Sequence, residues 1–303
     1  MTQVSAIEIE VEGQVLSGRA AEPDTAARAI VFALHGGSYS SRYYDLCSAP
    51  RASALRNYAD LGYRAIALDR PGYGASAGIA PERCGFRAQA ALLHRAIDRL
   101  HADRGDGLPV FLVGHSIGGM LAMTVAAAAA DTATPLHGVM ASGMGMVWQP
   151  GIHAMWASLV GDDPHVAVPN EARDQIMFVA DPALVDPAVQ QEVGEDLHPI
   201  PAAELRDALA WHEAMPEVAA GIRVPVLHVL PEYDGIWSAD EDARRQAATA
   251  LKGVEGAAVT VQRAAGHCLD AHRTGYAHHL TTAAFFETCL AVRATRADSG
   301  RSS

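Results

Sequence analysis

The residues of this chain best suited to do chemistry are 114–118, which read Gly-His-Ser-Ile-Gly. This G-x-S-x-G pattern follows the apolar run at residues 110–113, which predicts a strand, and precedes a run of small and apolar residues that predicts a helix. A serine at a sharp strand-to-helix turn is held in a strained backbone conformation, and the flanking glycines leave room for the crossing. The pattern therefore predicts that the Ser116 hydroxyl projects as a nucleophile.

A serine nucleophile needs a base, because its hydroxyl must lose a proton as it attacks. Of the fourteen histidines, His267 lies in a loop just after the last predicted strand, at residues 259–261. We therefore predict that His267 is the base. His272, five residues further along, is the alternative.

The base in turn needs a carboxylate that fixes its tautomer and stabilises the imidazolium. Asp234 closely follows the predicted strand at residues 226–230, and Glu232 is a nearby competitor. The strand near residue 141 ends in Ala-Ser-Gly and offers no acid. We predict Asp234 as the third member, which gives the chain order Ser116, Asp234, His267.

A tetrahedral intermediate also requires backbone donors for its oxyanion. The predicted strand at residues 30–34 leads into His-Gly-Gly-Ser at residues 35–38, where glycine allows the chain to turn its N–H groups inward. We assign the oxyanion hole to the backbone N–H groups of Gly37 and Ile117, with Ser38 as a third candidate donor. His35 is expected to brace this loop by hydrogen bonding.

Strands and helices alternate along the chain, which is typical of a parallel sheet with right-handed crossovers. The strict alternation at residues 7–12 predicts a half-exposed antiparallel edge strand. Residues 147–221 interrupt the alternation of strands and helices, because they have helical character and contain tryptophans and methionines. They are predicted to form an inserted helical cap. The core is then residues 1–146 and 222–293, and residues 294–303 are expected to be a disordered tail.

Composition excludes several classes of protein. The chain has 303 residues, 50% of them hydrophobic, and a formal net charge of −12, which disfavours binding to nucleic acid or to an anionic membrane surface. The four cysteines are widely spaced, the first residues do not resemble a secretory signal, and no run reaches transmembrane length. We expect a soluble cytoplasmic protein without a metal or organic cofactor. Its expected partners are a small-molecule substrate and, as an open alternative, a second copy in a homodimer.

Taken together, the chain resembles the α/β-hydrolase superfamily. The matching blocks are His35, the Asp-Arg-Pro-Gly-Tyr-Gly-Ala-Ser block at residues 69–76, residues 114–119, residues 225–234, and Gly266-His267. The resemblance implies an α/β fold with a mostly parallel eight-stranded sheet, helices on both faces, and an active site at the carboxyl ends of the strands under the cap. It also implies that Asp69 shapes a turn and is not catalytic.

Relatives that form an alkyl ester carry aspartate at the nucleophile position, so Ser116 favours an acyl-enzyme. We predict a serine hydrolase of the carboxylesterase or thioesterase type, acting on an apolar acyl group or ring. The alternatives are a cofactor-free C–C bond hydrolase, an acyltransferase or cyclising thioesterase with the same triad, and a non-catalytic ligand-binding protein. The expected substrate-binding residues are Ser38, His115, Met144, Trp148 and Trp156, and either Arg42 or Arg173 could bind a carboxylate.

Overall fold

A computed structural model describes residues 2–104, 107–129, 133–179, 181 and 183–301. An eight-stranded sheet forms the centre of the molecule, with the spatial order β1-β2-β4-β3-β5-β6-β9-β10. The strands are β1 (Val4–Val11), β2 (Gln14–Ala21), β3 (Ile30–Leu34), β4 (Arg64–Leu68), β5 (Val110–His115), β6 (Leu136–Ser142), β9 (Val226–Pro231) and β10 (Ala258–Gln262).

The direction of the strands follows the hydrophobic pattern of the sequence. β1 pairs antiparallel with β2, and β2 pairs antiparallel with β4. The remaining pairings are parallel. Every residue of β3, β5 and β9 is buried, as expected for strands covered on both faces, whereas β1 alternates between exposed and buried residues along most of its length. The mostly parallel eight-stranded sheet is therefore confirmed.

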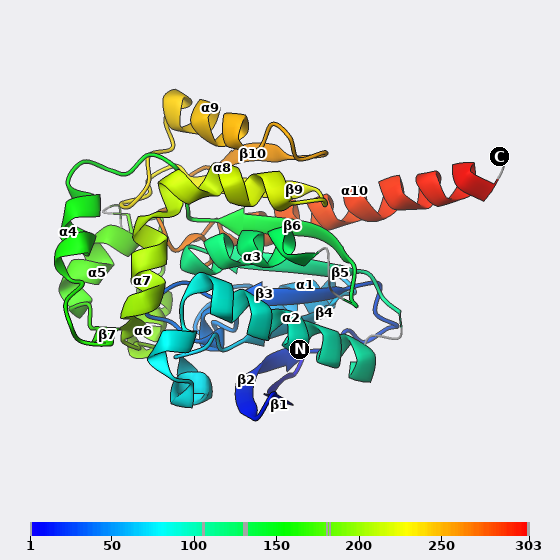
Figure 1. The fold of residues 1–303 in the computed structure, drawn as a ribbon, viewed down its shortest axis with the longest axis horizontal. Coiled ribbons are helices and arrows are strands. Elements are labelled where there is room, and N and C mark those ends of the chain that lie inside the picture. The colour runs from blue at the N-terminus through cyan, green and yellow to red at the C-terminus, as the bar shows by residue number, and fades with distance from the viewer. Residues whose placement is uncertain (1, 105–106, 130–132, 180, 182, 302–303) are drawn as a thin grey trace.

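Helices cover both faces of this sheet (Figure 1). On one side α2 (Phe86–Arg104), α3 (Ile117–Ala127) and α8 (Trp211–Gly221) pack next to one another, and α9 (Glu241–Ala250) packs against β10 and α8. On the other side α1 (Ala54–Asp60) packs against α10 (Gly275–Arg301). No helix in the described ranges combines the length and apolar character needed to cross a membrane.

The segment between β6 and β9 contains the expected cap, residues 147–221. Its elements are α4 (Ile152–Ser158), β7 (His165–Val166), α5 (Asn170–Met177), α6 (Pro187–Glu195), β8 (Ile200–Pro201) and α7 (Ala202–Leu209), followed by α8. Figure 1 shows α4 to α7 gathered at one end of the molecule. α8 instead packs against the core helix α3, so the last part of the expected cap lies in the helical layer of the core.

The C-terminal segment differs from the expectation of a disordered tail beginning at residue 294. α10 continues through Arg301 and projects from the body at the end opposite α4 to α7, while residues 302–303 lie outside the described part of the chain (Figure 1). Residues 291–298 contain no glycine or proline, and alanine and arginine are good helix formers, so the helix has no local reason to end at residue 294.

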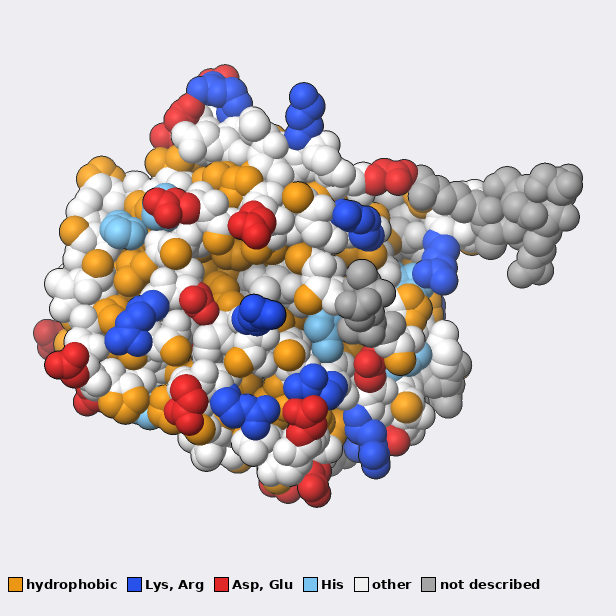
Figure 2. All heavy atoms as spheres, in the orientation of Figure 1, with side chains coloured by type: hydrophobic (Ala, Val, Ile, Leu, Met, Phe, Trp, Pro, Cys, Tyr) orange, Lys and Arg blue, Asp and Glu red, His pale blue; other side chains and the backbone are white. Residues whose placement is uncertain are grey.

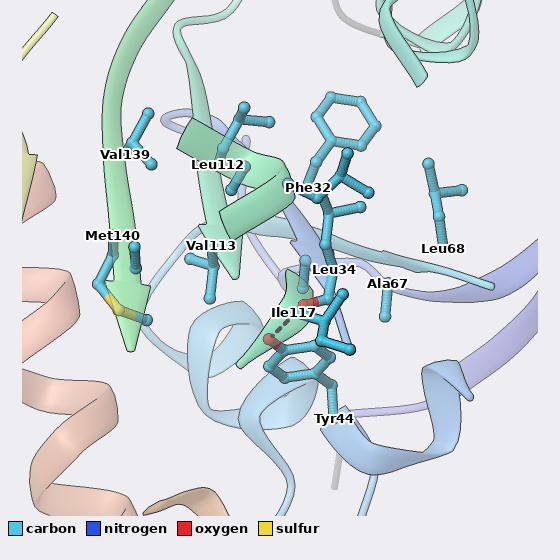
Figure 3. Packing of buried hydrophobic residues seen from close by; sticks show 14 of the residues in the cluster. Phe32, Leu34, Tyr44, Ala67, Leu68, Leu112, Val113, Ile117, Val139 and Met140 are labelled. Atoms are coloured by element: carbon cyan, nitrogen blue, oxygen red, sulfur yellow. Dashed lines mark hydrogen bonds between the residues drawn. The ribbon is translucent and has the colours of Figure 1, made fainter. Parts of the chain in front are cut away.

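Apolar side chains from the central strands and the adjoining helices form one core. Figure 3 shows Phe32 and Leu34 of β3, Leu112 and Val113 of β5, and neighbouring residues packed together. The hydroxyl of Tyr44 donates a hydrogen bond of 3.0 Å to the backbone carbonyl of Leu34 at the end of β3. This bond fixes the point at which the chain leaves the sheet for residues 35–38.

Charged side chains of both signs lie on the surface (Figure 2). On the face drawn in Figure 2, basic and acidic groups are interspersed rather than gathered into one continuous patch of a single sign.

Candidate active site

The turn between β5 and α3 places Ser116 in a conformation that a side chain rarely adopts. Its φ is 54° and its ψ is −124°, a strained arrangement that costs about 1–3 kcal/mol. A Cβ atom on Gly118 would lie 2.0 Å from the carbonyl oxygen of Leu34, and one on Gly114 would lie 2.2 Å from the carbonyl oxygen of Gly118. Both glycines are therefore required by close backbone approaches, as the G-x-S-x-G spacing predicts.

The structure brings Ser116, His267 and Asp234 together in one hydrogen-bonded chain. The Oγ atom of Ser116 lies 2.8 Å from Nε2 of His267. The Nδ1 atom of His267 lies 3.0 Å from both carboxylate oxygens of Asp234. The three residues are only 8%, 1% and 3% exposed, respectively. Low exposure strengthens these interactions, since little water competes for them.

Backbone amides fix the orientation of the Asp234 carboxylate. Its Oδ1 atom accepts hydrogen bonds from the N–H of Ile236 at 2.7 Å and of Trp237 at 3.3 Å. A carboxylate can only accept, so His267 must carry its proton on Nδ1. Nε2 is then left unprotonated and facing Ser116, which is the tautomer that a general base requires.

The two competing residues are occupied elsewhere. Glu232 accepts a hydrogen bond of 2.9 Å from the N–H of Ala264. His272 accepts a hydrogen bond of 3.0 Å from the N–H of Gly266 through Nε2, and its Nδ1–H donates to the carbonyl of Cys268 at 2.7 Å. Both side chains therefore bind backbone groups near His267, and neither takes part in the hydrogen-bonded chain that ends at Ser116.

The expected oxyanion donors lie beside Ser116. Gly37 and Ile117 both line the cavity in front of the Ser116 hydroxyl. Among the hydrogen bonds of the described residues, neither backbone N–H donates to another protein group. Ile117 is also the first residue of α3, where the helix dipole favours negative charge. The two amides are thus available to an oxyanion.

The cavity that reaches Ser116 is almost entirely apolar. It has an empty volume of about 440 Å³, including open space at its mouth. Its lining residues come from the core, the expected cap and the loop after β9: Gly37, Ser38, Ser116, Ile117, Met120, Trp148, Trp156, Met177, Ile200, Leu205, Ala208, Ile236 and Trp237. Three of the expected substrate-binding residues, Ser38, Trp148 and Trp156, are among them.

Two of the expected substrate-binding residues lie away from the cavity. His115 is 1% exposed and stacks on Tyr43, with ring centroids 4.8 Å apart. Burial, and secondarily the neighbouring His267, lowers the pKa of His115 well below its usual value, so the ring is neutral. Met144 is fully buried and lies near Gly119 at the start of α3. Neither side chain is therefore among the described residues that line the cavity, and both pack next to the serine turn.

Neither arginine considered for carboxylate binding lines the cavity. Arg42 is exposed at the surface, and Arg173 is buried between Asp174 and Tyr39. In the described ranges, no group of three or more histidine, cysteine or acidic side chains is arranged to hold a metal ion.

Several residues that line the cavity were not predicted from the sequence. Ile236 and Trp237 follow Asp234 directly, and a search for apolar residues beside each expected catalytic residue would have found them. Ile200, Leu205 and Ala208 come from β8 and α7, where the sequence gives no sign of which helix face meets the core. Their role depends on tertiary packing alone.

Comparison with known proteins supports the fold described above. A model of a family described as the alpha/beta hydrolase family matches residues 30–278. Human monoglyceride lipase is 32% identical over 120 residues, which are 39% of this chain and 37% of that protein. The chain therefore matches little more than a third of that relative's length.

Solved structures extend the likeness over nearly the whole chain. A monoglyceride lipase from Saccharomyces cerevisiae is 14% identical, with a TM-score of 0.69 over 96% of this chain and 94% of that one. A thermophilic esterase from Thermogutta terrifontis is 16% identical, with a TM-score of 0.64 over 94% of this chain and 99% of that one. At these identities the two structures establish the fold.

Proposed function

The chain belongs to the alpha/beta hydrolase family, and we propose that it is a serine hydrolase that cleaves a neutral carboxylic ester or thioester through an acyl-enzyme. The hydrogen-bonded chain from Ser116 through His267 to Asp234 carries this proposal. The free amides of Gly37 and Ile117 and the apolar cavity in front of Ser116 support it.

Acylation begins when the Ser116 oxygen attacks the substrate carbonyl carbon while Nε2 of His267 takes the hydroxyl proton. The negative charge that forms on the carbonyl oxygen is stabilised by the amides of Gly37 and Ile117. Asp234 stabilises the imidazolium that results. His267 then gives its proton to the leaving alcohol or thiol as the carbon–oxygen or carbon–sulfur bond breaks, which leaves the acyl group on Ser116.

Deacylation repeats these steps with water. Nε2 of His267 removes a proton from a water molecule as the water oxygen attacks the acyl carbon. Collapse of the second tetrahedral intermediate breaks the bond to Ser116, and the proton returns from His267 to the serine oxygen. A carboxylic acid is released and the enzyme is restored.

The cavity lining favours an uncharged, apolar substrate. Among the described residues that line it, there is no arginine, lysine, aspartate or glutamate. An anionic acyl group would lose its hydration there without gaining an ion pair, which is unfavourable. The tryptophans Trp148, Trp156 and Trp237 provide broad apolar surface for an alkyl chain or a ring. The partial sequence match to a monoglyceride lipase supports monoacylglycerols as one set of candidates.

We further propose a reducing, cytoplasmic location, since all four cysteines are free thiols in the structure.

The first experiment is labelling with a fluorophosphonate, followed by mass spectrometry of the modified peptide, alongside hydrolysis of p-nitrophenyl esters of increasing chain length. The proposal predicts labelling at Ser116, ester turnover with a chain-length optimum, and loss of both in Ser116→Ala. Asp45→Asn, at a carboxylate that binds Arg56 and Ser53 and does not line the cavity, serves as a control for general damage. Labelling without turnover of esters or thioesters would contradict the proposal and favour C–C hydrolysis or acyl transfer, and absence of labelling would favour a ligand-binding protein.

A further inference from the structure

A fully buried ion pair connects the expected cap to the loop that forms the oxyanion hole. Arg70 follows β4 and Glu204 lies on α7, and both side chains are 0% exposed. Burying two charges is costly unless every donor and acceptor is satisfied. The hydrogen bonds of Arg70 and Glu204 therefore show which parts of the chain this ion pair holds in place.

Arg70 satisfies all five of its side-chain N–H donors. Nε–H donates to the carbonyl of His35 at 2.7 Å, and Nη2–H donates to the carbonyl of Gly36 at 3.1 Å. The remaining donors of Nη1 and Nη2 bind both carboxylate oxygens of Glu204 and Oε1 of Gln89. One guanidinium thus binds two successive carbonyls of the loop that precedes Gly37.

The ring of His35 donates a second hydrogen bond to the carbonyl of Gly36. Its Nε2 accepts a hydrogen bond of 3.1 Å from the backbone N–H of Arg70, so the ring proton is on Nδ1, which donates to the carbonyl of Gly36 at 2.8 Å. Burial and the charge of Arg70 lower the pKa of His35 to about 3, which keeps the ring neutral and preserves this pattern.

The orientation of the Gly36 carbonyl determines the orientation of the Gly37 amide. The two groups belong to one trans peptide unit, in which C=O and N–H point in opposite directions. Arg70 and His35, which donate to this carbonyl, are not among the described residues that line the cavity, so the carbonyl points away from it. The N–H of Gly37 is thereby turned toward the cavity. A flipped peptide would lose both hydrogen bonds and would aim a carbonyl oxygen at the position of the developing oxyanion.

Glu204 sets the position of the guanidinium. Besides Arg70, its carboxylate accepts hydrogen bonds from the hydroxyl of Tyr73 at 2.6 Å and from Nε2 of Gln89 at 2.5 Å. The residues next to it on α7, Leu205 and Ala208, line the cavity. The helix that forms part of the substrate pocket, α7, thus also holds Arg70 against residues 35–38, which we call the oxyanion loop.

We infer that Arg70 and Glu204 are positioning residues that hold the Gly36–Gly37 peptide with its N–H toward the cavity, so that docking of α7 completes the oxyanion hole. This inference rests on the proposed acyl transfer at Ser116. Because an oxyanion exists only in the transition state and the intermediates, loss of the pair lowers kcat and leaves KM nearly unchanged.

The experiment compares Glu204→Gln with a double variant, Arg70→Met with Glu204→Met. The double variant replaces both buried charges by apolar side chains, a change that folded proteins commonly tolerate, so it carries the test if Glu204→Gln does not fold. Asp207→Ala is the matched control, because Asp207 also docks α7 on the core, through a 2.6 Å hydrogen bond from the N–H of Phe86, without contact to the oxyanion loop. Circular dichroism and thermal unfolding establish that each variant is folded.

Rates are normalised to active sites titrated to completion with a fluorophosphonate. We expect kcat to fall by about tenfold in Glu204→Gln and by about 100-fold in the double variant, approaching the effect of removing one oxyanion donor. Binding of an alkyl boronic acid, whose tetrahedral adduct occupies the hole, should weaken by the same factor, while binding of the product carboxylic acid and KM change by less than about threefold.

A folded double variant that keeps kcat within about threefold of wild type overturns the inference. An equal loss in Asp207→Ala, or a loss of kcat without weaker boronate binding, also overturns it, because general loosening of α7 would then explain the result. Failure of the proposed function is separately visible, since the wild-type protein itself would then neither turn over esters nor label at Ser116.

Discussion

Replacing Asp234 by asparagine should invert the tautomer of His267. In the wild-type protein Oδ1 of Asp234 accepts from the amides of Ile236 and Trp237, and both carboxylate oxygens lie 3.0 Å from Nδ1 of His267. An asparagine keeps its oxygen on the two amides, because only the oxygen can accept from them. Its NH2 group then faces Nδ1, which must accept a hydrogen bond and so loses its proton to Nε2.

The protonated Nε2 cannot take the proton of Ser116, although all heavy atoms keep their places. The same substitution in a serine protease of known mechanism lowers kcat by about 10⁴-fold, which corresponds to about 5.4 kcal/mol in the activation free energy. We expect a loss of this order here, since His267 is only 1% exposed and little water competes for its hydrogen bonds.

The assay is the kcat/KM of p-nitrophenyl ester hydrolysis at neutral pH, with thermal unfolding of each variant in parallel. Glu232→Gln is the matched control, because Glu232 bonds to the amide of Ala264 and does not touch His267. It should retain activity within about threefold of wild type. An Asp234→Asn enzyme that loses less than about tenfold would refute the tautomer argument, and a larger loss in Glu232→Gln would identify the other carboxylate as the partner of His267.

Three further predictions concern the serine turn, the cavity and a buried carboxylate. Gly118→Ala places a Cβ atom 2.0 Å from the Leu34 carbonyl oxygen, so it should markedly lower the melting temperature although alanine has a better helix propensity than glycine. Gly78→Ala is the control, because a Cβ atom there has no neighbour within 4 Å and should leave the melting temperature unchanged. Equal melting temperatures for the two variants would contradict the packing argument. Leu205→Phe narrows the cavity and should move the ester chain-length optimum of kcat/KM toward shorter acyl groups; an unchanged optimum would place the acyl group elsewhere. Burial alone would raise the pKa of Asp270, but its 2.9 Å hydrogen bond with His279 and the electrostatic effects of His279, His278 and His115 together outweigh burial and lower that pKa. The resulting stabilisation is present above the unfolded pKa of about 4 and is lost as pH falls through the lower folded pKa. In urea unfolding, Asp270→Asn should therefore be destabilised at pH 7 by more than at about pH 3, and a gap that widens on acidification would reverse the assigned sign.

The sheet and the serine site could be predicted because their signals are local. The strands β3, β5 and β9 are continuous apolar runs, since a strand covered on both faces has no position that favours a polar residue. The glycines around Ser116 are required by backbone approaches within a few residues of the turn and by the neighbouring strand. Asp234 and His267 follow from the order in which parallel strands end at one edge of the sheet.

The lining of the cavity could not be predicted in the same way. The helices α4 to α7 have between seven and nine residues each, so their hydrophobic patterns are too short to show which side meets the core. His115 is among the substrate-binding residues expected from the sequence. It is, however, the last residue of β5, a strand covered on both faces, and its ring packs against Tyr43 instead of lining the cavity.

Glu204 shows most clearly why buried polar contacts cannot be predicted from the sequence. Glutamate is rarely buried, so Ala-Ala-Glu-Leu-Arg at residues 202–206 reads as a helix with an exposed acid. Its burial becomes favourable only because Arg70, Tyr73 and Gln89 converge on it from the core and supply a donor for each lone-pair direction. Those partners lie between 115 and 134 residues away in the chain, beyond the reach of any periodicity. An ion pair satisfied so fully, and joined on its other side to the carbonyls of His35 and Gly36, specifies one position of α7 relative to the oxyanion loop. Apolar contacts alone would allow α7 to slide, which is the physical reason to expect that the pair is used for positioning.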